Sequence, residues 1–196
     1  YLYIPLKLTF WPAWLAYALV TGTVATGCWV IAHECGHNAF SDNRATQDAI
    51  GYALHSLLLV PYFSWQRSHA VHHSRTNHLT EGETHVPYVK GDAKGTLNLN
   101  LHNTIGEGPF AALQLVAHLA FGWPAYLLTG ATGGSARGVT NHFVPNVNTG
   151  PVELFPGSWK RKVWISDIGV VGVVAGLTFY VAGPRFYIVG LRLYAA

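Results

Sequence analysis

Five histidines in two short clusters are the residues of this chain whose type and spacing could bind a metal. The first cluster reads HECGH over residues 33–37, and the second reads HAVHH over residues 69–73. The imidazole ring binds zinc, copper, iron and nickel, so histidines alone do not identify the metal. The candidate metal ligands are His33, His37, His69, His72 and His73.

Helical geometry would let each cluster present its ligands from one face. At about 100° per residue, two histidines four positions apart lie about 40° apart on a helix. The three histidines of the second cluster fall within an arc of about 100° by the same geometry. A structural role could account for either cluster alone. The two together, close to a long uncharged stretch, favour a metal centre at a membrane surface.

The composition is that of a chain embedded in lipid. Asp, Glu, Lys and Arg make up only 11% of the residues, against about 25% in ordinary globular proteins. No charged residue occurs from Leu8 to Ala32, and about 20 apolar residues are enough to cross the hydrocarbon core. Trp11, Trp14 and Trp29 near the ends of this stretch fit interfacial anchors. We predict a transmembrane helix here, the alternative being a buried helix of a soluble protein.

Three further apolar runs follow. The run Ala49–Phe63 is about 15 residues long and is interrupted by His55 and Pro61, which suits a re-entrant or interfacial segment better than a span. Pro109–Thr132 and Val163–Gly183 are longer. A turn is expected at Gly183-Pro184, after which another apolar run begins.

The positive charges predict the orientation. The polar segments 64–108 and 133–162 each carry four Lys or Arg residues, and such loops face the cytoplasm. The run 109–132 between them would then lie in the interface. The predicted fold is an all-α integral membrane protein, with transmembrane helices, interfacial helices and both histidine clusters in a cytoplasmic region.

Other features set the limits of this interpretation. A net charge of +3 is too weak and scattered for nucleic-acid binding, which needs clustered Lys and Arg. Cys28 and Cys35 are the only cysteines, so a disulfide framework is not expected. The chain has no methionine, even at position 1. We expect residues 1–196 to be one domain and an internal piece of a longer polypeptide, in which no targeting segment can be judged.

The first cluster also fits the zinc-protease motif H-E-x-x-H, in which Glu34 would be the general base. A single zinc needs only one more protein ligand, with a fourth position left for water. That requirement gives no reason for a second run of three histidines, whereas two metals would give one. A membrane protein that binds metal for transport or sensing, without catalysis, is a third possibility.

The stretch 29–73 resembles the membrane fatty acid desaturases, and within them the endoplasmic-reticulum oleate Δ12 (omega-6) desaturases of plants, algae and fungi. His33 and His37 match the first histidine box of that family, and His69, His72 and His73 match the second. The likeness continues through Val86-Pro87, Gly122-Trp123-Pro124 and residues 164–169. The third box of the family is absent from this chain. Ala70 and Val71 stand where the plant enzymes usually have basic residues.

The resemblance implies a non-haem di-iron centre, and it adds no catalytic or cofactor-binding residue beyond the metal ligands. It implies that O2 and electrons from cytochrome b5 serve to insert a cis double bond into an acyl lipid, converting oleate, as the oleoyl phospholipid, to linoleate. It also implies an endoplasmic-reticulum membrane, with the boxes facing the cytoplasm. Omega-3 desaturases, hydroxylases, acetylenases and epoxygenases share the boxes and remain alternatives. The remaining iron ligands would lie outside this chain.

The other polar residues of the apolar and histidine-rich regions receive structural or supporting roles. We expect surface or supporting positions for His78 and His85, and a ligand-orienting or carbonyl-binding role for His55. Glu34 is expected to accept a hydrogen bond from a histidine or to contact a carbonyl. Asp167 is expected at a helix start, where it would complement the helix dipole. The histidines without cluster partners are taken as structural: His102, His118 and His142.

Overall fold

The computed structural model describes residues 4–5, 7–89 and 91–194, and the regular structure among them is helical. The only β pairing of these residues is an isolated bridge between Thr140 and Asn148. This confirms the predicted all-α fold. The elements are η1 (Leu8–Phe10), α1 (Trp11–Gly36), α2 (Arg44–Leu57), α3 (Tyr62–Ser74), α4 (Ala93–Ile105), α5 (Glu107–Ala117), η2 (His118–Gly122), α6 (Trp123–Thr129) and α7 (Trp159–Tyr194).

Three helical stretches are long and apolar enough to cross a membrane by length and composition: Leu8–Gly36, Glu107–Thr129 and Trp159–Tyr180. The first confirms the span predicted over Leu8–Ala32. Along it Leu19, Val20 and Val24 are each more than 60% exposed, as side chains that contact lipid would be. The second covers residues 109–129 of the run 109–132, whose interfacial placement stays a prediction.

The described residues group into two compact units. One comprises Tyr1–Gln66 with Ile165–Ala196, and the other comprises Arg67–Trp164. Helices α3 and α7 each begin in one unit and end in the other. The assignment of residues 1–196 to one domain stays a prediction.

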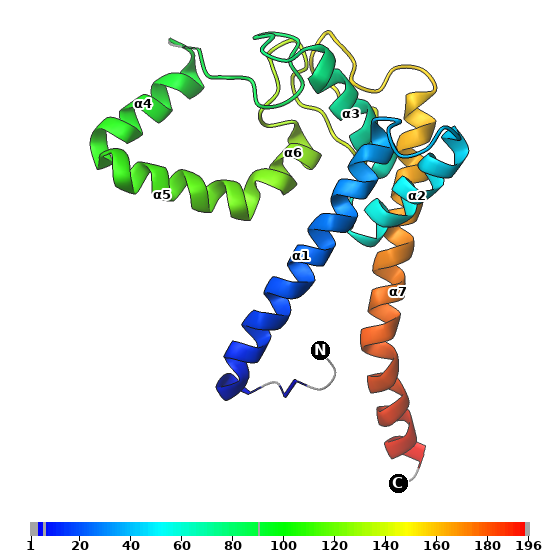
Figure 1. Ribbon diagram of the computed structural model, residues 1–196. Coiled ribbons are helices and arrows are strands. Elements are labelled where there is room, and N and C mark those ends of the chain that lie inside the picture. The colour runs from blue at the N-terminus through cyan, green and yellow to red at the C-terminus, as the bar shows by residue number, and fades with distance from the viewer. Residues whose placement is uncertain (1–3, 6, 90, 195–196) are drawn as a thin grey trace. The chain divides into compact units, whose positions relative to one another are not determined.

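In the first unit α1 and α2 lie side by side (Figure 1). Helix α2 begins at an Asn43 cap, whose side chain accepts a hydrogen bond from the Thr46 amide at 3.1 Å. It ends in a tight turn in which the Val60 amide donates to the His55 carbonyl at 2.8 Å. Pro61 then precedes α3, where its missing N–H costs no helical hydrogen bond. The run 49–63 is therefore the end of α2, a turn and the start of α3.

Close packing fixes the contact between α2 and the start of α3. A β-carbon added to Gly51 would lie 2.4 Å from the Tyr62 ring. The Tyr62 side chain is fully buried, and its hydroxyl donates to Asp48 Oδ1 at 3.2 Å. Tyr62 therefore has no room to move away, and only glycine fits at position 51.

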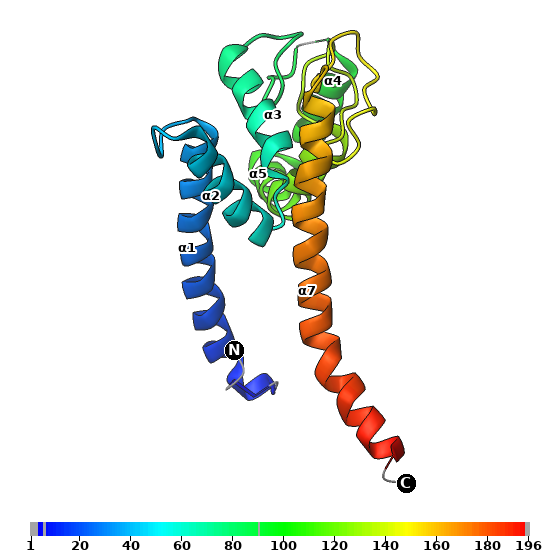
Figure 2. The ribbon, with the colours of Figure 1, turned by 90° about the vertical axis from the view of Figure 1, so that its right-hand side faces the viewer.

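Helix α7 corrects two expectations. It begins at Trp159, two residues after a left-handed Gly157 (φ 58°) that itself follows Pro156. Asp167 therefore lies two turns inside the helix and not at its start. The helix also continues through Gly183 and Pro184 as one long element (Figure 2), so the expected turn is wrong. Long apolar helices of membrane proteins tolerate Gly and Pro.

In the second unit α4, α5, η2 and α6 follow one another along an open curve (Figure 1). A π-helical turn, His118–Gly122, joins α5 to α6. Pro124 follows it and has no N–H to donate to the Ala120 carbonyl, which gives a physical reason for the irregular turn. Helix α6 ends at Gly130 in the left-handed conformation (φ 59°), as glycine does at many helix ends.

The apolar core of the second unit consists of Val71, Leu154, Phe155 and Val163, with Trp159 packed against it. Val71 lies on α3 between the histidines of the second box. The core therefore holds one face of α3 and leaves the histidines on the other.

Substitution of Gly51 tests the close contact with Tyr62. Gly51→Val should lower the thermal unfolding midpoint of the detergent-solubilised full-length protein, because overpacking of this kind costs about 1–3 kcal/mol. Gly22→Ala is the control, since nothing lies within 4 Å of the added methyl. Equal midpoints for the two variants would contradict the packing described.

Candidate metal centre

The first box places two imidazoles side by side at the end of α1. His33 Nε2 and His37 Nε2 are 3.3 Å apart, and the ring centroids are separated by 4.5 Å. His33 Nδ1 lies 2.9 Å from Glu34 Oε1. A carboxylate can only accept, so Nδ1–H is the donor and the lone pair of His33 is left at Nε2. The expected contact of Glu34 with a histidine is confirmed.

The second box forms a similar pair on α3. His69 Nε2 and His73 Nε2 are 3.1 Å apart, with ring centroids at 4.5 Å. The His72 ring lies 5.6 Å from that of His73 and 6.1 Å from that of His69. The structure therefore brings His69 and His73 together and holds His72 beside them.

The spacing within each pair fits metal ligation. With metal–nitrogen bonds of about 2.0–2.1 Å, two neighbouring ligand nitrogens are about 2.9 Å apart at a right angle and about 3.4 Å apart at a tetrahedral angle. The observed 3.3 and 3.1 Å fall within this range. An all-imidazole donor set suits iron, zinc or copper. The residues present therefore fit a metal, and each box could supply two nitrogens to one ion.

His72 faces the segment that follows α3. Its ring centroid lies 6.0 Å from that of His85. Burial lowers the pKa of His72, and the rings of His73 and His85 lower it further, while a hydrogen bond to the Thr84 backbone acts in the opposite direction. The neutral ring, which is the form that binds a metal, is thereby favoured.

An aromatic cluster supports the first box. The rings of Trp29 and Trp65 lie 5.4 and 5.3 Å from the His33 ring. The same two rings lie 5.7 and 4.8 Å from that of His55, which is fully buried. Burial lowers the pKa of His55 to about 4. His55 is thus an uncharged core residue that packs on the rings which hold His33, in keeping with a supporting role.

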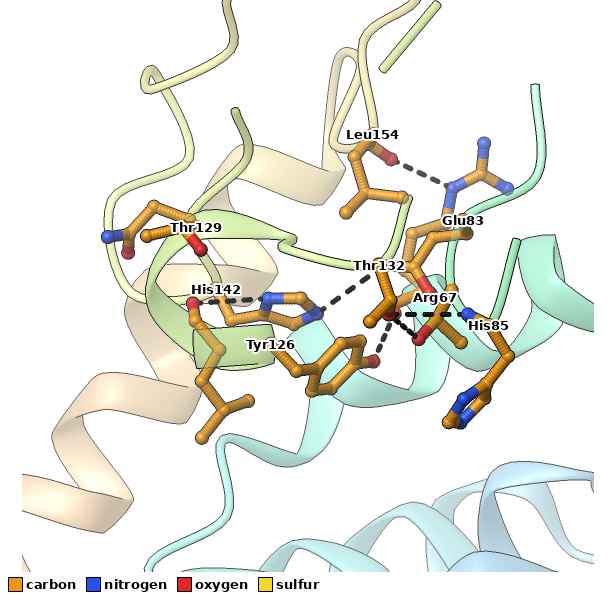
Figure 3. A network of polar contacts seen from close by, with 12 residues as sticks. Arg67, Glu83, His85, Tyr126, Thr129, Thr132, His142 and Leu154 are labelled. Atoms are coloured by element: carbon orange, nitrogen blue, oxygen red, sulfur yellow. Dashed lines mark hydrogen bonds and ion pairs between the residues drawn. The ribbon is translucent and has the colours of Figure 1, made fainter. Parts of the chain in front are cut away.

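A buried polar network lies behind the second box (Figure 3). Ser68 precedes His69 in α3, is fully buried, and shares a short hydrogen bond with the Tyr126 hydroxyl. Glu83 is also buried. Desolvation raises the pKa of Glu83 to about 7, although the Ser68 hydroxyl and the Arg137 guanidinium oppose this shift.

His142 completes this network. It is fully buried, its Nδ1–H donates to the Leu127 carbonyl at 3.3 Å, and its Nε2 lies 4.0 Å from Glu83 Oε1. Burial lowers the pKa of His142 to about 4. A neutral, buried ring fits the structural role expected for this histidine.

Three members of the network were not anticipated from sequence: Glu83, Tyr126 and Arg137. Arg137 is buried and donates to the Glu81 and Glu153 carbonyls at 3.1 and 3.3 Å. No motif marks these residues, because their partners are distant in the chain: Tyr126 lies 58 positions from Ser68, and Arg137 lies 56 positions from Glu81. The one available signal was that a buried acid such as Glu83 requires a buried basic partner such as Arg137.

Three of the other histidines make contacts away from the two boxes, and their exclusion from the metal centre stays a prediction. His78 is exposed, and its Nδ1 accepts from the Glu81 amide at 3.0 Å. His102 is also near the surface, 5.3 Å from the Phe110 ring. His118 binds the carbonyl of Gln114 in its own helix at 2.7 Å.

The fold and these pairs define a helical membrane protein with histidine boxes on two of its helices. Residues 9–196 match the sequence profile of the fatty acid desaturase family, which covers most of the chain. The chain therefore belongs to the fatty acid desaturase family.

Several curated relatives agree with this assignment. A Delta(12) fatty acid desaturase from Calendula officinalis is 40% identical over 162 residues, 83% of this chain and 40% of the relative. A Delta(12)-fatty-acid desaturase from Arabidopsis thaliana is 39% identical over 168 residues, 86% and 41% of the two chains. An omega-6 fatty acid desaturase, endoplasmic reticulum, from Brassica juncea is 38% identical over 177 residues, 90% and 43%.

The chain thus spans about 40% of the length of the relatives it matches. No solved structure matches it.

The buried carboxyl gives a prediction about pH. Because the pKa of Glu83 rises from 4.5 to about 7 on folding, the folded protein holds a proton in that window which the unfolded chain releases. Stability from this group is present below pH 4.5 and is lost as the pH rises toward 7. Relative to Glu83→Gln, which cannot titrate, wild-type stability should fall by up to about 3 kcal/mol across the window.

Thermal unfolding of the full-length protein over a pH series measures this difference. Glu153→Gln is the matched control: it makes the same substitution at a half-exposed side chain and retains Glu83, so it should keep the fall in stability that Glu83→Gln removes. A wild-type profile parallel to that of Glu83→Gln would contradict the prediction.

Proposed function

We propose that the full-length protein is an acyl-lipid desaturase that converts oleate to linoleate by inserting a cis double bond at the Δ12 (omega-6) position. The observation that carries the proposal is the pair of helix-borne histidine boxes, with nitrogens 3.3 and 3.1 Å apart, in a member of the fatty acid desaturase family. The names of the relatives, Delta(12) and omega-6 desaturases, support the choice of position.

Two iron ions would be held by His33, His37, His69, His72 and His73, together with ligands outside this chain. Bound iron supplies the activation of O2 that removal of hydrogen from an unactivated methylene requires, since side chains alone do not provide such an oxidant. The residues of this chain orient the donors. Glu34 keeps the Nδ1 proton on His33, so that Nε2 carries the lone pair.

The proposal includes a metal centre to which both histidine boxes contribute ligands. The boxes lie in different compact units, and α1 and α3 must bring them to the same leaflet for two ions to be bound in common. The segments 64–108 and 133–162, each with four Lys or Arg, support a cytoplasmic position for the boxes. Cytochrome b5 would deliver the electrons there.

A membrane substrate fits the three apolar helices, since an oleoyl phospholipid is already dissolved in the bilayer. The name of the Brassica juncea relative supports an endoplasmic-reticulum location. Omega-3 desaturation, hydroxylation or acetylenation would use the same histidines, so the position and type of oxidation rest on the relatives alone.

A zinc protease is a weaker alternative. Its general base would be Glu34, which here accepts from His33 Nδ1 at 2.9 Å. It would also leave the second box without a use. A metal-binding membrane protein without catalysis would need both boxes but would change no lipid.

Expression of the complete reading frame in a yeast strain that contains no linoleate tests the proposal. Gas chromatography of the fatty acids should show linoleate. His37→Ala and His73→Ala should each reduce it to background, because either change removes one nitrogen of a pair. His102→Ala is the control and should retain wild-type product.

Metal analysis of the purified full-length protein distinguishes a di-iron desaturase from a zinc protease. Two irons per chain are expected, whereas one zinc would favour the protease. A new double bond at another position would move the protein within the family. An unchanged fatty acid profile from an iron-loaded protein would refute the desaturase proposal.

A further inference from the structure

The Thr132 hydroxyl ties down the segment that faces His72. Its Oγ1 accepts a hydrogen bond from the His85 amide at 3.2 Å and lies 2.7 Å from the Thr84 hydroxyl. Figure 3 shows the Thr132 side chain joined in this way to the backbone of His85. The Thr132 carbonyl also accepts from the Val86 amide at 3.0 Å. One residue thus holds three consecutive positions.

Neighbouring backbone contacts complete this clamp. The Gly134 amide donates to the Gly82 carbonyl at 2.9 Å. A β-carbon at Gly133 would lie 2.8 Å from the Glu83 carbonyl, so the two backbones approach as closely as glycine allows. Both ends of the segment 82–86 are therefore fixed against residues 132–134. We call this set of contacts between the two segments the Thr132 clamp.

The clamped segment adopts a conformation that needs support. His85 has φ 55°, a left-handed value that is costly for a residue with a side chain and persists only when its surroundings enforce it. This conformation places the His85 ring 6.0 Å from that of His72. In the same segment, the Thr84 backbone is hydrogen-bonded to the His72 ring.

We propose that Thr132 is a positioning residue for His72, acting through Thr84 and His85. The inference rests on the proposed function, in which His72 is a metal ligand. A ligating histidine almost always uses its second ring nitrogen to bind a carbonyl, carboxylate or water, and loss of that support typically lowers metal affinity or activity 10- to 100-fold. The Thr132 clamp supplies the backbone group in this role.

The test compares release of bound metal from purified full-length variants to an excess of chelator. Thr132→Val keeps the shape of the side chain but removes its hydroxyl, and should speed release about tenfold. Thr132→Ser restores the hydroxyl and should release within about twofold of wild type. Thr129→Val is the matched control, because the Thr129 hydroxyl donates to the Ala125 carbonyl of its own helix.

A double mutant shows whether the effect passes through His72. Thr132→Val added to His72→Ala should not speed release further, because the ring that the clamp orients is already gone. The same factor in both backgrounds would mean general loosening and would overturn the proposal. If His72→Ala retains no metal, the test rests on the release rates of Thr132→Ser and Thr132→Val. Equal rates for these two variants would overturn the proposal.

Failure of the proposed function would be recognised separately. A wild-type preparation that binds metal but makes no linoleate would refute the desaturase activity. The release rates of the same preparations would still decide the role of Thr132.

Discussion

The one-turn spacing of imidazoles on a helix is the constraint on which the rest of this structure depends. Two histidines four residues apart meet at 3.1–3.3 Å between Nε2 atoms only if the backbone is helical across both. Helix α1 must therefore continue to Gly36, beyond the apolar stretch, and α3 must extend as far as His73. Helix α2 packs against α1, and Leu154, Phe155 and Val163 pack against α3 at Val71.

On α3 the two faces are kept distinct by what packs behind it. Val71 lies in an apolar core with Leu154, Phe155 and Val163, and Ser68 lies in the polar network with Tyr126. The three histidines of the second box are left on the remaining face of α3. A buried acid with a raised pKa and a buried, uncharged histidine occupy the same network, so its protonation is linked to the stability of the helix that carries the second box.

Local patterns were sufficient to predict the helical pairs, the first span and the all-α fold. The four-residue spacing needs no information beyond helical geometry, and the uncharged stretch from Leu8 needs only its length. The contact of Glu34 with His33 also follows from adjacency in the chain. The proposed metal and its proposed chemistry rest on family resemblance and on the relatives, because imidazoles accept several metals.

What sequence missed depended on tertiary contacts or on local competition. The hydrogen bonds of the Thr132 clamp and the bond between Ser68 and Tyr126 join positions 46 to 58 residues apart, and no short pattern encodes such pairs. The helix start assigned near Asp167 was wrong because Pro156 and Gly157 already allow α7 to begin at Trp159. The turn assigned at Gly183-Pro184 was wrong because an apolar helix can continue through both residues.

The π-helical turn between α5 and α6 changes the angular phase of one helical run. A wider turn accommodates an extra residue, so the side chains after it are rotated by about 100° from where an unbroken helix would place them. Before and within the turn, Leu115 and Leu119 are 61% and 79% exposed; after it, Tyr126 reaches Ser68. The first half of this run therefore exposes apolar side chains, whereas the second half directs the Tyr126 hydroxyl toward the protein interior. Deleting one residue from this turn would rotate Tyr126 away from Ser68, while the mean hydropathy of the run would hardly change.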